Sequence, residues 1–156
     1  MEPSFIIANT IEQFADGRKI FEEYAASLNF DLCFQGFAEE LDNLDKQYNA
    51  PTGALIVAYD GNIAIAAVGV RYFSEHTAEL KRMYVKQNYR GFKIGRELLA
   101  QAINCAKELG YHKILLDTRP SMANAISLYR DFGFIDISPY RHNPYSDAIF
   151  MEKRLE

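Results

Sequence analysis

The spacing of hydrophobic residues predicts a chain that begins with one strand and two helices. A short apolar run at residues 5–7 predicts the opening strand. Apolar positions then recur at helical spacing through residues 11–24, where Asn9 or Thr10 can cap the helix, and through residues 37–48. The first part of the chain therefore reads as strand, helix, helix.

The rest of the chain predicts three consecutive strands, followed by two helices that alternate with further strands. Asp60-Gly61-Asn62 is a hairpin signal, because glycine and asparagine tolerate the positive φ of such turns. Gly110 ends a long helix and Gly133 a shorter one that Ser121 can cap. The predicted strands are 54–59, 63–72, 79–85, 113–117, 134–137 and 148–155, and the predicted helices are 94–109 and 121–133.

This order, βααβββαβαββ, predicts an α+β fold with three layers. We expect a mixed, mostly antiparallel twisted sheet with helices on both faces. The strand–helix–strand unit around residues 94–109 predicts a right-handed crossover between two parallel strands. The length of 156 residues suits one domain over residues 1–156.

Composition and charge narrow the function classes. A hydrophobic fraction of 49% with 24% charged residues is typical of a soluble globular protein, and the net charge of −4 argues against a nucleic-acid partner. We find no secretory signal and no apolar stretch of bilayer length, so we expect a cytoplasmic protein without a membrane partner. Cys33, Cys105 and the three scattered histidines match no metal spacing, which predicts reduced thiols and no metal site.

The segment 83–96 carries the first chemical signal. A strand enters a loop with glycines at positions 91 and 95, and a long helix follows. The free N–H groups and the positive end of the helix dipole make such a junction an anion site that suits a pyrophosphate. The loop lacks the ending of a P-loop and the glycine spacing of a Rossmann fingerprint. Three basic residues add positive charge there: Arg90, Lys93 and Arg96.

This segment resembles the acetyl-CoA motif of the GNAT N-acetyltransferase superfamily, whose signature is Gln/Arg-x-x-Gly-x-Gly/Ala. The signature falls on Arg90-Gly91-Phe92-Lys93-Ile94-Gly95, with Lys93 at a position that is usually glycine. The flanks 78–85 and 96–99 and the later segment 125–134 are also typical of the family. The resemblance implies the GNAT fold and transfer of an acetyl group from acetyl-CoA to a primary amine by direct attack in a ternary complex.

By the same resemblance, one set of residues binds the cofactor. The backbone of the strand before the loop pairs with the pantetheine arm, and a backbone N–H near Val85 is the most plausible donor to the thioester oxygen. Met122 stands where the family usually has an asparagine, and Asn124 is the nearest substitute. The predicted cofactor-binding residues are Met83, Tyr84, Val85, Arg90, Gly91, Phe92, Lys93, Ile94, Gly95, Arg96 and Asn124.

Two residues are the leading catalytic candidates. Glu79 lies on the strand that leads to the loop, at the offset where relatives with a glutamate base carry it, and it competes with the reading of an exposed strand residue. Glu75 and His76 are alternative bases. Tyr129 matches the family tyrosine that protonates the leaving thiolate, and it competes with the reading of a core tyrosine.

The acceptor side is the least defined by sequence. The loop 139–147 is aromatic, polar and stiffened by two prolines, which is typical of a specificity loop or of a rigid exposed turn. The predicted acceptor-binding residues are Arg71, Tyr140, Arg141 and Asn143, of which Arg141 suits a carboxylate. The residues leave open an amino acid, a polyamine, an aminosugar or a protein amine as acceptor, with a small polar amine that bears a carboxylate favoured.

Three further questions stay open at this level. A longer acyl donor is compatible with the motifs. A non-catalytic acyl-CoA sensor on the same fold is the alternative function, supported by the departures at Lys93 and Met122 and opposed by the presence of Glu79 and Tyr129. A homodimer is compatible with the sequence, although no exposed apolar stripe requires one.

Overall fold

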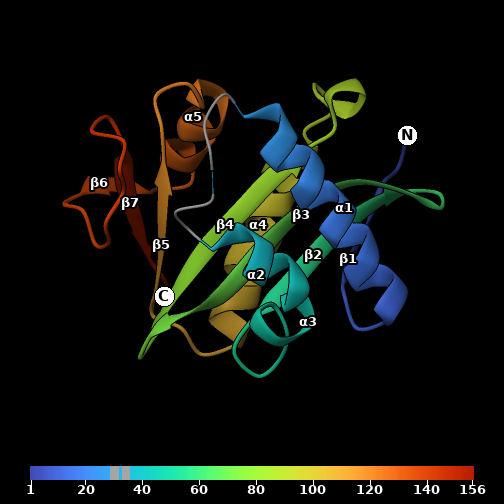
Figure 1. Ribbon diagram of the computed structural model, residues 1–156, viewed down its shortest axis with the longest axis horizontal. Coiled ribbons are helices and arrows are strands. Elements are labelled where there is room, and N and C mark those ends of the chain that lie inside the picture. The colour runs from blue at the N-terminus through green and yellow to red at the C-terminus, as the bar shows by residue number, and fades with distance from the viewer. Residues whose placement is uncertain (29–31, 33–35) are drawn as a thin grey trace.

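The computed structural model describes residues 1–28, 32 and 36–156, so the prediction for Cys33 lies outside the described residues. Seven strands form one sheet in the order β1-β2-β3-β4-β5-β7-β6 (Figure 1). The strands are β1 Ser4–Ile7, β2 Ala54–Asp60, β3 Ile63–Ser74, β4 Thr77–Val85, β5 Lys113–Thr118, β6 Ile135–Ile137 and β7 Ile149–Arg154. The helices are α1 Ile11–Ser27, α2 Phe37–Asp42, α3 Leu44–Gln47, α4 Ile94–Glu108 and α5 Ala123–Asp131, with a 3-10 helix, η2, at Gln87–Tyr89.

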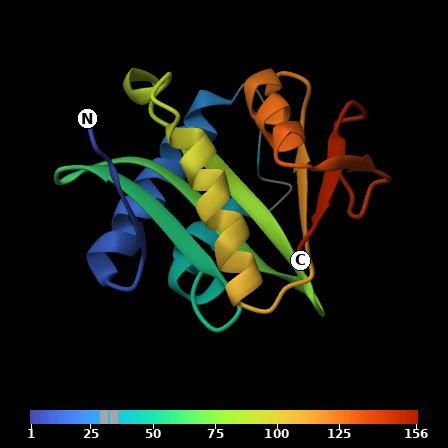
Figure 2. The same cartoon turned by 180° about the vertical axis from the view of Figure 1, so that it is seen from behind.

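Helices cover both faces of the sheet. Helices α1, α2 and α3 lie on one face (Figure 1), and α4 crosses the other with α5 beside it (Figure 2). Helix α4 buries Leu98 and Leu99 against the strands, and α1 buries Ile20 and Phe21 on the opposite face. The apolar stripe of each helix thus supplies one of two cores. The mixed sheet between helical layers confirms the predicted fold class.

The sheet is divided between β4 and β5. These strands are parallel and pair only through Thr77–Glu79 of β4 and Lys113–Leu115 of β5. Strand β5 then pairs with β7 over its whole length, while β4 continues beside β3. Figure 1 shows the two strands close together at one end and far apart at the other. The second half of β4 therefore has one edge that no described strand covers.

A bulge bends β4 at the same place. The register with β3 shifts between Ala67 and Gly69, and Arg82 on β4 adopts φ 60. A bulge places an extra residue in one strand and increases its local twist. The bend turns the free edge of β4 away from β5.

Most predicted elements are confirmed, with two corrections. The Thr10 hydroxyl caps α1 by accepting from the Gln13 amide at 3.2 Å, and Gly61 and Gly110 adopt φ 60 and 93. The single helix predicted over 37–48 is wrong, because Asn43 breaks it into α2 and α3. The Asn43 side-chain amide donates to the Glu39 carbonyl at 2.8 Å, and such a bond competes with helical backbone bonding.

The second correction concerns the start of α5. The helix begins at Ala123 after Met122, and no side chain caps it, so the prediction of a Ser121 cap is wrong. Among the described residues, no helix combines the length and apolar character that a bilayer crossing requires.

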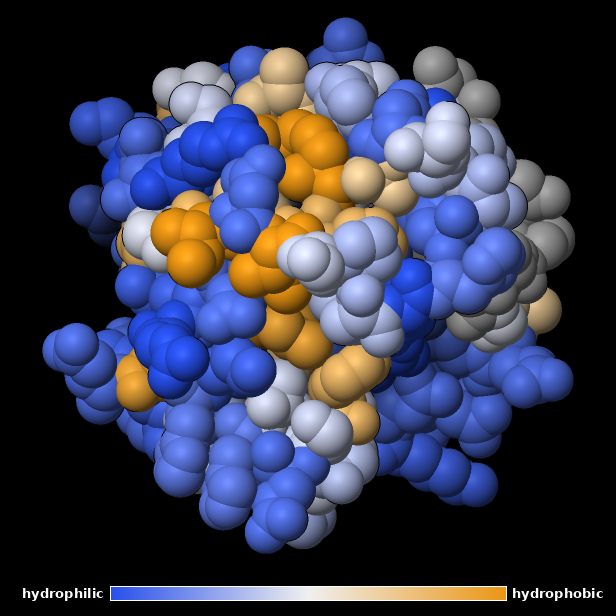
Figure 3. Space-filling view, turned by 90° about the vertical axis from the view of Figure 1, so that its left-hand side faces the viewer, coloured by the Kyte–Doolittle hydropathy of each residue, from blue (hydrophilic) through white to orange (hydrophobic). Residues whose placement is uncertain are grey.

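The most hydrophobic surface in Figure 3 lies on the face that contains the β6–β7 end of the sheet. Ile135 on the edge strand β6 is 61% exposed. Neither of the two cavities described below is lined by a described residue of β6 or β7.

Candidate active site

A cleft of about 610 Å³ opens along the free edge of β4. Its walls come from the end of α1, the second half of β4, the loop before α4, the first turn of α4 and the start of α5. The residues that line it are Ser27, Leu28, Met83, Tyr84, Val85, Tyr89, Arg90, Gly91, Lys93, Ile94, Gly95, Arg96, Ser121, Met122, Ala123, Asn124, Ala125 and Leu128. All of the predicted cofactor-binding residues except Phe92, which is 60% exposed, belong to this lining.

The loop at one end of the cleft has the geometry of an anion site. Gly91 and Lys93 adopt φ 89 and 63, and Lys93 precedes α4 without a side-chain cap. The amides of the first turn of α4 lack intrahelical acceptors and form the positive end of the helix dipole. The Arg90 side chain is held nearby, because its Nε donates to the Val85 carbonyl at 3.1 Å and its guanidinium lies over the Tyr84 ring at 5.4 Å. A pyrophosphate is the type of ligand that this loop suits.

The strand along the cleft is half paired. Tyr84 and Val85 pair with Ala67 and Ala66 of β3. Because backbone groups in a strand alternate between its two edges, the remaining groups of this segment face the cleft. An amide-bearing chain laid along this edge would find matching donors and acceptors.

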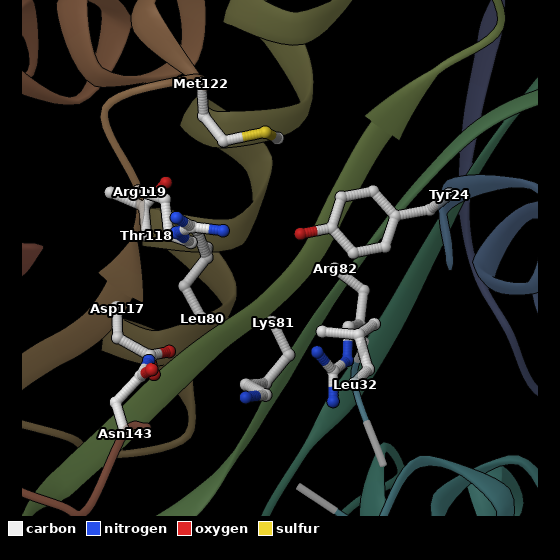
Figure 4. Close-up of a pocket in the computed structure, with 10 residues that line it drawn as sticks. All are labelled: Tyr24, Leu32, Leu80, Lys81, Arg82, Asp117, Thr118, Arg119, Met122 and Asn143. Carbon is white, nitrogen blue, oxygen red and sulfur yellow. The ribbon is translucent and has the colours of Figure 1, made fainter. Parts of the chain in front are cut away.

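A second, smaller cavity of about 40 Å³ lies between β4 and β5, below the start of α5 (Figure 4). The residues that line it are Tyr24, Leu32, Leu80, Lys81, Arg82, Asp117, Thr118, Arg119, Met122 and Asn143. In Figure 4, the Tyr24 hydroxyl and the Arg119 guanidinium point toward one another across this space. Met122 lines both cavities, so they adjoin at that side chain.

The structure places Glu79 in a buried cluster of positive groups. The side chain is 0% exposed. Its carboxylate accepts from the Tyr140 hydroxyl at 2.7 Å, from Arg141 at 2.7 Å, and from Arg71 at 3.1 and 3.2 Å. Burial alone would raise the pKa of Glu79, but Lys81, Arg141 and Arg71 outweigh it and hold that pKa below its ordinary value. Three of the predicted acceptor-binding residues therefore meet on this one carboxylate.

A second buried carboxylate extends this cluster toward α2. Glu40 accepts from Arg82 at 2.9 and 3.1 Å and from the Tyr48 hydroxyl at 2.9 Å. Arg71 lies 3.7 Å from Glu40 and 3.1 Å from Glu79, so it bridges the two. The ionic network thus connects α2 to the loop 139–147 beneath the smaller cavity.

Tyr129 is buried in α5 and lines neither the cleft nor the smaller cavity. Its side chain is buried next to Phe134, with ring centroids 5.7 Å apart. Burial, reinforced by the negative potential of Tyr24 and Asp117, raises its pKa far above the ordinary value. No partner among the described residues forms a hydrogen bond with its hydroxyl.

The alternative bases lie far from the cleft. His76 stacks on His112 with ring centroids 4.4 Å apart, at the turn that begins β4. The loop that suits a pyrophosphate follows the other end of this nine-residue strand, which is about 26 Å away at ~3.3 Å per residue. Glu75 shares that turn, so neither side chain reaches the cleft. Asn143 donates to Asp117 at 3.4 Å and lines the smaller cavity.

Comparison with known proteins agrees with this geometry. The model of the acetyltransferase (GNAT) family matches residues 18–134. An uncharacterized N-acetyltransferase of Schizosaccharomyces pombe is 35% identical over 161 residues, which cover 100% of this chain and 98% of the relative. The chain belongs to the GNAT family of acetyltransferases.

Solved structures share the fold of this GNAT enzyme. A GNAT acetyltransferase from Staphylococcus aureus Mu50 superposes with a TM-score of 0.79 at 22% identity, covering 99% of this chain and 100% of that one. The Salmonella typhimurium protein yncA, solved with its cofactor acetyl-CoA, gives 0.71 at 18% identity and covers 99% and 94%. Family membership makes this chain an acetyl-CoA-dependent N-acetyltransferase.

Several residues of this GNAT site escaped the sequence analysis. Lys81, Arg82 and Asp117 line the smaller cavity, and Glu40 supports it from α2. Lys81 and Arg82 follow one another on a strand, which gives no sign that both are buried. Lys81 lies near Glu79 of the same strand, but Arg82 pairs with Glu40 of α2, so the local sequence does not show how the two are neutralised. Among the described residues, no group of three or more histidine, cysteine or acidic side chains could hold a metal ion.

Proposed function

We propose that this GNAT enzyme transfers the acetyl group of acetyl-CoA to the primary amine of a small polar acceptor by direct attack. One observation carries this proposal: the cleft along the free edge of β4 adjoins a second, smaller cavity at Met122. A donor in the cleft and an acceptor in the cavity would meet at that boundary. The arrangement needs no covalent enzyme intermediate, because both reactants are held together.

The residues of the cleft fit acetyl-CoA. The uncapped first turn of α4, with Arg90, Lys93 and Arg96, would hold the pyrophosphate, and the free edge of β4 would pair with the pantetheine amides. Bound acetyl-CoA supplies an activated acetyl thioester. Arg96 also pairs with Asp131 at 3.1 Å, which ties α4 to α5 across the cleft.

We propose that the Tyr129 hydroxyl donates a hydrogen bond to the departing sulfur and stabilises it as the thiolate. Its raised pKa keeps the hydroxyl protonated throughout the neutral range, and no described residue competes for that proton. A tyrosine in this position can bury its ring and still use its hydroxyl.

For Glu79 the contacts favour a positioning role over that of a base. A good base at neutral pH needs a raised pKa, whereas three cations lower the pKa of Glu79 and occupy its oxygens. We propose that it holds Tyr140 and Arg141, and with them the loop 139–147, against β4.

Release of free thiol from acetyl-CoA tests the proposed function. The amines would be an amino acid, a polyamine, an aminosugar and a short peptide. We expect amine-dependent release with at least one class, and a higher KM for acetyl-CoA in Arg90→Ala. Lys107→Ala, at an exposed position on the far end of α4, is the matched control. Tight binding of acetyl-CoA without release by any class would refute catalysis on these acceptors.

A further inference from the structure

The smaller cavity has a positive lining. Of the described residues around it, three are cations and one is a carboxylate: Lys81, Arg82 and Arg119 against Asp117. Each of the three cations lies on or directly after a strand at the point where β4 and β5 separate. The lining of the cavity therefore has more cationic than acidic side chains, beside the proposed point of acetyl transfer.

The partners of two of these cations lie outside the cavity lining. Arg82 is committed to Glu40 on α2. Arg119 forms two bonds to Asp147, at 3.0 and 3.1 Å, and lies 4.1 Å from the centre of the Tyr145 ring. Figure 4 shows its guanidinium directed into the space that the Tyr24 hydroxyl faces. Arg119 is thus fixed in orientation by its neighbours while it borders the cavity.

Lys81 is the most deeply buried of the cations that border the cavity. The residue is 3% exposed, against 6% for Arg82, and its Nζ lies 3.9 Å from Glu79. Burial, together with the neighbouring Arg82, lowers its pKa to about 8 against the opposing effect of Glu79 and Asp117. The protein thus keeps an ammonium where solvation is poor. An anion placed beside it would stabilise its charged form.

The volume limits what that anion can be. One water needs roughly 10–15 Å³ of such space, so a volume of about 40 Å³ holds about three groups of that size. A carboxylate has three heavy atoms and fits, whereas a phosphate group has five. Met122 forms the wall toward the cleft, so the amine of the same molecule would lie on that side.

We propose that the acceptor is a short amino carboxylate, whose carboxylate docks between Lys81 and Arg119 and whose amine faces Met122. This inference rests on the proposed function, because it names the acceptor class of the same site. The Tyr24 hydroxyl is placed to donate to the same carboxylate.

Paired acceptors give the kinetic test. Each pair consists of an amino acid and its carboxamide, for example glycine with glycinamide and alanine with alaninamide. Values of kcat/KM are compared per neutral amine, because the amide lowers the pKa of the amine. We expect a preference of at least about tenfold for the carboxylates. The preference should shrink in Lys81→Met and in Arg119→Gln and persist in Lys107→Ala. Equal values within the pairs would overturn the proposal.

Proton uptake on binding is a readout that does not depend on turnover. Calorimetry at pH 8, in buffers of different ionisation enthalpy, follows glycine added to the CoA-bound protein. A carboxylate beside Lys81 raises its pKa, so we expect wild type to take up as much as about half a proton more than Lys81→Met does; the comparison cancels any proton change at the glycine amine itself. Arg119→Gln, at a less buried position, keeps the test valid if Lys81→Met does not fold. It should weaken glycine binding.

The two readouts separate the two proposals. Bound acetyl-CoA without turnover of any amine would refute the proposed function, and glycine binding with proton uptake would still support the carboxylate site. Turnover of amines that carry no carboxylate, together with a lack of saturable glycine binding, would overturn the carboxylate site and leave the proposed function standing.

Discussion

Replacing Glu79 by glutamine separates a positioning residue from a general base. The amide keeps the shape of the side chain but removes the negative charge that Arg71 and Arg141 share. Removing one member of a buried ion pair costs about 3–5 kcal/mol. We expect the lower end, near 3 kcal/mol, because Arg71 retains Glu40 at 3.7 Å and Arg141 is partly exposed.

The kinetic effect of Glu79→Gln should be a weaker binding of the acceptor. Glu79 anchors Tyr140 and Arg141, so Glu79→Gln should raise the KM for the acceptor and leave the KM for acetyl-CoA unchanged. The pH dependence of kcat should keep its wild-type shape. In thermal unfolding, a loss of about 3 kcal/mol corresponds to a decrease in Tm of about 6–12 °C for a chain of this size.

A role of Glu79 as the general base would give different kinetics. If Glu79 were the base, kcat would fall about 10²- to 10⁴-fold, the acidic limb of the pH profile would disappear, and the KM for the acceptor would be unaltered. Glu108→Gln, on the exposed end of α4, is the control for a general loss of negative charge and should match wild type in both assays.

Three further predictions follow from the site. Tyr129→Phe should lower kcat about 10²-fold with little change in Tm, since its hydroxyl has no described partner; unchanged turnover under rate-limiting chemistry would remove it from the mechanism. Lys93→Gly should stabilise the protein against urea by about 1–2 kcal/mol, because Lys93 adopts φ 63, while raising the KM for acetyl-CoA; a loss of stability would contradict this. The folded-state pKa values of Glu40 and Glu79 are lowered, so their contribution to stability is present above the ordinary carboxyl pKa and is lost as pH falls through the lowered values. Urea unfolding between pH 7 and pH 3 should show that loss, and Glu79→Gln should reduce its size.

Local patterns predicted the fold and the cleft well. The periodicity of residues 94–109 gave α4, and Gly91 with the basic residues beside it marked the loop, because both signals arise from neighbours in sequence. The positive φ at Lys93 shows that this position keeps its backbone conformation without the usual glycine. The break at Asn43 was missed because it depends on how one side chain competes for a backbone carbonyl.

The acceptor side could not be predicted in the same way. Glu79 was expected to act as a base or to be exposed, and its actual surroundings come from β3, β4 and the loop 139–147. The separation of β4 from β5 brings Lys81 and Arg119 to one cavity, although 38 positions separate them in sequence. Such juxtapositions are set by sheet topology, which periodicity does not encode.

The short pairing between β4 and β5 also provides an internal reporter of ligand binding. Three residues of each strand join the two parts of the sheet. Beyond them, the backbone amides on the free edge of β4 pair with no strand among the described residues, so they should exchange their hydrogens quickly in the unliganded protein. A ligand laid along that edge would slow their exchange, while the amides that bond to β3 would be unaffected. Hydrogen exchange at residues 83–85 therefore distinguishes occupancy of the cleft from occupancy of the smaller cavity without any label or activity assay.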